Sequence, residues 1–138
     1  LPGLVIDNTQ AKLTGEWSHS SSIGGYVGTE YLHDANDSKG MKSATFRTKI
    51  PKAGRYEVRV AYTANANRAS KVPVTIESKA GRKKVELNQR EAPKHTGFQT
   101  VATIDVAADE MVSVVISNAE TNGHVIVDAV QWLPAKSE

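Results

Sequence analysis

The sequence predicts an all-β fold, an antiparallel β-sandwich of the jelly-roll kind with eight to ten short strands. Three observations support this prediction. Apolar and polar residues alternate in several segments, which is the period of a half-buried strand. Turn residues separate these segments at intervals typical of sandwiches. No segment of helical length carries the apolar stripe of an amphipathic helix.

The first part of the chain gives the weakest strand signals. A short apolar entry at 4–6 is followed by the polar residues 7–9. Trp17 leads into a Ser-rich stretch and the pair Gly24-Gly25. The alternation of residues 26–32 then predicts a strand.

The centre of the chain carries the clearest pattern. Residues 44–50 alternate between apolar and polar side chains, and the segment 51–54 ends this strand with proline and glycine. In 56–62, aromatic and β-branched residues occupy every second position. Because a helix would scatter these residues around its circumference, we expect a strand here.

The second half of the chain predicts a hairpin and three further strands. Gly81 stands between the apolar segments 72–76 and 85–87, an arrangement typical of a hairpin. The three further strands are expected at 101–106, 112–116 and 125–133. In the last of them, Trp132 is expected in the core.

Length and composition indicate one ordinary globular domain over residues 1–138, because 138 residues suffice for a core and neither an internal repeat nor a linker interrupts them. The net charge of +2 argues against a nucleic-acid partner. No apolar run reaches the roughly 20 residues of a membrane span, so no membrane insertion is expected. The chain has no cysteine, which excludes disulfides and thiol chemistry. Its abrupt start, without a signal peptide, predicts a domain excised from a larger secreted protein.

Several motifs in a fixed order carry a family resemblance. They include Val5-Ile6-Asp7-Asn8, Gly15-Glu16-Trp17, the run 25–32, the segment from Pro51 to Tyr62, Asn67-Arg68-Ala69, Val72-Pro73-Val74, Asn88-Gln89 and Val127-Asp128-Ala129-Val130. On these motifs the chain resembles the golvesin and xanthan-lyase carbohydrate-binding-like domain, a β-sandwich module of bacterial secreted proteins. The resemblance covers nearly the whole length of the chain. Where the family often has a tryptophan this sequence has Phe98, so an aromatic contact with sugar is in doubt there.

The residues and the resemblance together predict a site for a polysaccharide or oligosaccharide. Sugar recognition uses flat aromatic faces, with a few polar side chains to orient the ligand. The expected ligand-binding residues are Trp17, Tyr26, Tyr62, Asn65, Asn67, Arg68 and Gln89. Most follow the end of a core strand, where scaffolds present binding groups. The alternative is structural: Trp17 in the core, Arg68 paired with an acid, and the two asparagines capping turns.

No cofactor is expected to be required, and a structural calcium ion is a possible addition. Asp7 and Asp128 stand on the first and last strands, which sandwiches often bring together, and carboxylates are calcium ligands. The alternative for Asp128 is a buried carboxylate that accepts backbone N–H groups. The loop 34–40 is either an irregular calcium loop or an Asx-rich turn, because its glycine is one place late for an EF-hand.

No catalytic constellation is evident, so the chain is not expected to be an enzyme. Ser18 and His19 are adjacent, and neighbours on a strand point to opposite faces. The predicted function is a non-catalytic carbohydrate-binding module that targets a larger bacterial protein, extracellular, on the cell surface or in the periplasm, to a polysaccharide. It would be covalently attached to neighbouring domains. The alternatives are a structural or protein-interaction module, marked by an apolar patch, and a cryptic hydrolase, marked by a cleft with a perturbed acid or histidine.

Overall fold

The structure is a computed structural model that describes residues 3–95 and 97–135. These residues form twelve strands in three antiparallel sheets and one short 3₁₀ helix, η1 (Asn8–Gln10). Leu1 and Pro2 lie outside the described residues. In the described part of the chain, no helix has the length and apolar character needed to cross a membrane.

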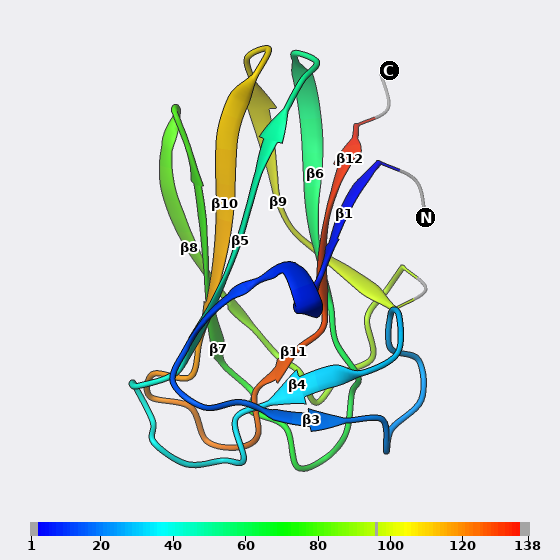
Figure 1. Cartoon of the computed structure of the whole chain (residues 1–138), viewed down its shortest axis with the longest axis vertical. Coiled ribbons are helices and arrows are strands. Elements are labelled where there is room, and N and C mark those ends of the chain that lie inside the picture. The colour runs from blue at the N-terminus through cyan, green and yellow to red at the C-terminus, as the bar shows by residue number, and fades with distance from the viewer. Residues whose placement is uncertain (1–2, 96, 136–138) are drawn as a thin grey trace.

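Two of the sheets form the body of the molecule (Figure 1). The four-stranded sheet has the order β1 (Leu4–Asp7), β12 (Ala129–Pro134), β6 (Gly54–Ala61) and β9 (Phe98–Val106). The five-stranded sheet has the order β2 (Lys12–Thr14), β5 (Ser43–Ile50), β10 (Glu110–Ser117), β7 (Val72–Ser78) and β8 (Gly81–Leu87). The fold is therefore the predicted antiparallel β-sandwich.

The third sheet is short and lies at one end of the sandwich, among the long loops (Figure 1). Its order is β11 (Ile126–Val127), β4 (Tyr31–His33) and β3 (Ser18–Ser20). We call this end, with the connections 21–30, 62–71, 88–97 and 118–125, the loop end.

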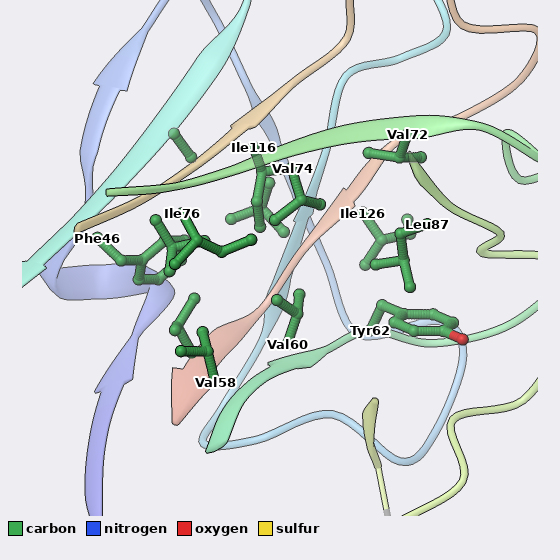
Figure 2. Close-up of a cluster of buried hydrophobic side chains, with 14 of the residues drawn as sticks. Phe46, Val58, Val60, Tyr62, Val72, Val74, Ile76, Leu87, Ile116 and Ile126 are labelled. Carbon is green, nitrogen blue, oxygen red and sulfur yellow. The ribbon is translucent and has the colours of Figure 1, made fainter. Parts of the chain in front are cut away.

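The core lies between the two large sheets and follows from the period-two pattern of their strands. Phe46, Val60, Val74 and Ile116 come from β5, β6, β7 and β10, and all four are fully buried. Figure 2 shows that side chains from both sheets meet in this cluster. Trp132 is fully buried too, as predicted.

The structure corrects two strand predictions. Only Tyr31–His33 of the segment 26–32 is a strand, since Gly25 and Gly28 adopt φ values of +95° and +72° that break extended structure. The predicted strand 125–133 is divided at Asp128, where the chain leaves β4 and joins β1 and β6. Such short pieces raise the number of strands to twelve, against the eight to ten predicted.

Candidate functional site

Arg68, at the loop end, holds its own loop in shape. Its side chain is 4% exposed. Nε donates to the backbone oxygen of Thr63 at 2.9 Å, and the two terminal nitrogens donate to Thr63 Oγ1 and Asn67 Oδ1. The guanidinium carbon also lies 5.8 Å from the centre of the Tyr31 ring. Arg68 therefore contacts a hydroxyl and a carbonyl of its own loop. The structural alternative predicted from the sequence was an ion pair between Arg68 and an acid.

The side-chain amide of Gln89 forms the hydrogen bonds that the backbone of a neighbouring strand would form. It is fully buried, its Nε2 donates to the backbone oxygen of Ile126 at 2.9 Å, and its Oε1 accepts the backbone N–H of the same residue at 2.7 Å. This pair of bonds reproduces the pairing that a strand would give to β11. The amide thus fastens the loop 88–97 to the last part of the chain.

Two of the three predicted aromatic platforms lie in the core. Trp17 is 8% exposed and donates its indole N–H to the backbone oxygen of Thr14. Tyr62 is 3% exposed, and its hydroxyl donates to the backbone oxygen of Glu91 at 2.6 Å. Burial and the nearby charge of Glu91 raise the pKa of Tyr62 to about 12. Figure 2 shows the hydroxyl of Tyr62 at the margin of the apolar cluster.

The other three predicted residues keep part of their surface. Tyr26 is half-buried, with its ring centre 5.8 Å from that of Tyr31. Asn65 is half-buried and Asn67 is exposed. Asn65 Oδ1 accepts the backbone N–H of Asn67 at 3.3 Å, which is a turn-capping contact. Sugar binding by these residues stays a prediction.

Phe98 is buried on the outer face of the four-stranded sheet. It packs with Ala61 and Ala129, and Val27 from the loop end lies against this cluster. Only 3% of Phe98 is exposed. The aromatic ring at the family's tryptophan position therefore has no free face for a sugar in this chain.

A cleft opens at the edge of the sandwich where β8 and β9, the last strands of the two large sheets, face each other. Its volume is about 270 Å³, and Tyr62 lies in its wall. The polar side chains that line it are Glu86, Asn88, Glu91, Lys94, Gln99 and Thr100. Loop 88–97 closes one side, and Gln99 Oε1 holds that loop by accepting the backbone N–H of Lys94.

Several polar groups in the cleft are free to bind a ligand. Among the described residues, the amide Nδ2 of Asn88, the carboxylate of Glu91 and the ammonium of Lys94 have no hydrogen-bonding partner. They offer donors and an acceptor around one hollow, as polyhydroxy ligands require. Sequence reasoning missed this cleft because it forms between strands of different sheets. The motif Asn88-Gln89 was its one signal.

Asp7 and Asp128 come together as predicted, beneath the loop that contains Val27 and Gly28. Asp128 is fully buried, and its Oδ2 accepts the backbone N–H of Val27 at 2.8 Å. Among the described residues, the Oδ1 atoms of Asp7 and Asp128 are buried without a partner. Burial, together with the charge of Asp7, raises the pKa of Asp128 to about 7, against the partial effect of the Val27 bond.

This carboxylate pair can be neutralised by a proton or by a cation. Two orphaned carboxylate oxygens are suitable ligands for calcium. Within the described ranges, however, the pair is not joined by a third histidine, cysteine or acid as a metal ligand. A calcium ion here would need backbone oxygens and water for its remaining ligands, and it stays a proposal.

The loop 34–40 has the contacts of an Asx-rich turn. Asp34 is fully buried, and its carboxylate accepts hydrogen bonds from Lys39 Nζ at 2.7 Å, from Asn118 Nδ2 and from the backbone N–H groups of Asn36 and Val125. Burial raises the pKa of Asp34, but these hydrogen bonds outweigh it and hold the pKa below its ordinary value. A lysine ammonium therefore supplies the positive charge in this loop.

The serines beside His19 make contacts of their own. Ser18 and His19 are neighbours on β3 and so point to opposite faces. His19 Nδ1 contacts the carboxylate of Glu30. Ser20 Oγ lies within hydrogen-bonding distance of Tyr31 Oη, at 3.3 Å. Within the described part of the chain, no serine hydrogen-bonds to His19, so the contacts of a Ser-His pair are not formed here.

Comparison with known proteins finds a matching family and similar sequences and structures. The Golvesin C-terminal domain family matches residues 4–133. Xanthan lyase of Bacillus sp. (strain GL1) is 32% identical over 139 residues, which cover 96% of this chain and 15% of that protein. The structure of a Paenibacillus xanthan lyase superposes with a TM-score of 0.88 and 29% identity, over 96% of this chain and 13% of the lyase.

More distant structures share the fold alone. A Podospora anserina β-(1,4)-mannanase, described as GH26-CBM35, superposes with a TM-score of 0.68 at 16% identity, over 98% of this chain and 28% of that one. The chain thus spans only a small part of each relative.

Proposed function

Because the chain belongs to the Golvesin C-terminal domain family, we propose that it is a non-catalytic carbohydrate-binding module of a larger polysaccharide-active protein. Nearly all of the chain matches a part of xanthan lyase that makes up 15% of that protein, which supports an accessory role beside covalently attached neighbouring domains. We further propose that the parent protein acts outside the cell or at its surface.

The observation that carries the proposal is the cleft between β8 and β9. Its volume of about 270 Å³ is just below the roughly 300–1,000 Å³ of small-molecule pockets, which suits one sugar unit of a chain. Asn88 and Lys94 donate hydrogen bonds to sugar oxygens, and Glu91 accepts them from hydroxyl groups. The cleft opens at the sandwich edge, so a polymer can extend beyond it on the side that the loop after β8 leaves open.

Binding by one such module is weak, because each sugar hydroxyl loses contacts with water that the cleft must replace. Weak binding suffices for a tethering role. Attachment to a neighbouring domain raises the effective concentration of polysaccharide near that domain. The module therefore contributes localisation, and the chemistry takes place elsewhere in the parent protein.

A glycan array with the purified chain tests the proposal. We expect selective binding to a small set of polysaccharides, and at least about a tenfold weaker signal for a Glu91→Ala/Lys94→Ala variant. The matched control, Lys71→Ala/Glu120→Ala, removes the same two charges from exposed positions away from the cleft. A blank array from folded protein would favour the structural or protein-interaction module instead.

A further inference from the structure

The outer face of the five-stranded sheet is cationic. The strand residues that alternate with the buried ones point away from the core. Cross-strand register places Lys12, Thr45, Val115, Thr75 and Lys84 in one row across all five strands. The cations on this face are Lys12, Arg47, Lys49, Arg82 and Lys84.

Cations outnumber acids on this face. The same face carries two acids, Glu77 and Glu86, so five positive charges stand against two negative ones. The net charge of the face is +3, whereas that of the whole chain is +2. One ion pair is formed, between Arg82 and Glu77 at 3.5 Å. Among the described residues, the other four cations have no carboxylate partner.

A depression on this face holds Arg47 and a further lysine, Lys79. It has a volume of about 350 Å³ and is lined by Arg47, Glu77, Ser78, Lys79, Met111 and Ser113. Arg47 comes from β5, and Lys79 comes from the turn between β7 and β8. Glu110 holds that turn in place, because its Oε2 accepts the backbone N–H of Lys79 at 2.8 Å. The ammonium of Lys79 is thus carried by an anchored turn.

The chemistry of the depression fits a carboxylate. A guanidinium donates two parallel hydrogen bonds to one carboxylate group, and an ammonium adds a point charge. Ser113 also lines the depression and lies opposite Arg47 and Glu77 in the cross-strand register. Glu77 also lines the depression, but its charge is engaged by Arg82.

We propose that this face carries a second binding site, the depression, which shares no lining residue with the cleft, and that it binds an anionic polysaccharide by docking a sugar carboxylate between Arg47 and Lys79. The choice of polymer rests on the proposed function; the carboxylate site rests on the depression and its charges. At its outward-pointing strand positions the described sheet carries Ser, Thr, Lys and Arg side chains but no aromatic ring. Single-stranded nucleic acid would use such rings for base stacking, so a polysaccharide is favoured.

Affinity electrophoresis in gels that contain polygalacturonate tests the surface, with neutral dextran gels beside them. We expect retardation by polygalacturonate at about 50 mM salt and its loss at about 500 mM, because salt screens exposed charges. An Arg47→Ser/Lys79→Ser variant should bind at least about tenfold more weakly. The control Arg55→Ser/Lys71→Ser has the same net charge, its two positions lie outside the strands of this sheet, and it should stay within about twofold of the unmodified chain.

Three results would overturn the proposal. The first is no retardation by polygalacturonate, and the second is an equal loss in the control variant, which would indicate net charge alone. The third is equal affinity for single-stranded DNA, which would indicate a general polyanion surface. The Glu91→Ala/Lys94→Ala cleft variant separates the two sites. It should lose the array signal of the cleft and keep its retardation by polygalacturonate.

Discussion

Gln89 is the residue whose predicted binding role the structure replaces most clearly with a structural one. Its amide is fully buried and satisfies both backbone groups of Ile126. Gln89→Ala leaves a buried N–H and a buried carbonyl without partners, so we expect the free energy of unfolding to fall by about 3 kcal/mol. Urea denaturation measures this change. In the exposed control Gln10→Ala the loss should stay below about 1 kcal/mol, and equal losses in the two variants would contradict the bridging role.

Asp128 makes stability depend on pH. Its pKa of about 7 in the folded chain lies above the ordinary value of about 3.9 in the unfolded chain. The folded state therefore binds the proton more tightly, and unfolding free energy falls as the pH rises from about 4 to about 7, by up to about 4 kcal/mol. In buffer with EDTA, Asp128→Asn should match the unmodified chain at pH 4 and exceed its stability at pH 8. Parallel curves for the two proteins would contradict the shifted pKa.

Calcium offers a second way to neutralise the same pair. If calcium binds Asp7 and Asp128, millimolar calcium should raise the melting temperature of the unmodified chain at pH 8, and EDTA should reverse the rise. Asp7→Asn and Asp128→Asn should each abolish the response. If calcium does not change the melting temperature of the unmodified chain, a proton is the species that neutralises the pair.

At the scale of elements, the loop 24–28 is fixed by one glycine. Gly28 has φ +72°, and a Cβ there would lie 3.3 Å from both carboxylate oxygens of Asp7. Gly28→Ala should cost about 1–3 kcal/mol, since both the backbone and the contact are strained. Gly24 has no positive φ and no neighbour within 4 Å of such a Cβ, so Gly24→Ala should be neutral within about 0.5 kcal/mol. Thermal unfolding of both variants compares them, and equal costs would contradict this role for Gly28.

The same elements show how far sequence reasoning reaches. Strands of seven to nine residues span several alternations and were predicted; the prediction for β5 begins one residue late and that for β9 three residues late. Strands of two or three residues, such as β3 and β11, contain no full period and carry no such signal. Apolar and polar residues alternate in 26–30, but the backbone conformation of Gly28 makes this segment a loop. Local backbone geometry overrides the pattern there.

At the scale of the whole molecule, the residues predicted for a sugar site fall into two groups: some are buried, and others keep part of their surface exposed. Arg68 and Gln89 have the side chains of ligand-binding residues, and the loop end uses them to hold its own backbone. Their hydrogen-bond partners lie as far as 37 residues away in the chain, so no local pattern could reveal them. The cleft and the cationic face depend equally on which strands become neighbours. The net charge of +2 for the whole chain does not reveal that cations outnumber acids on one face.

An NMR titration of the isotope-labelled chain with an oligosaccharide chosen from the glycan array is the most direct measurement of whether and where sugar binds. We predict chemical-shift changes that concentrate at the cleft, on Asn88, Glu91 and Lys94, with smaller changes along β8 and β9. Changes confined to Tyr26, Asn65 and Asn67 at the loop end, or no changes with any oligosaccharide, would contradict a sugar site between the two sheet edges.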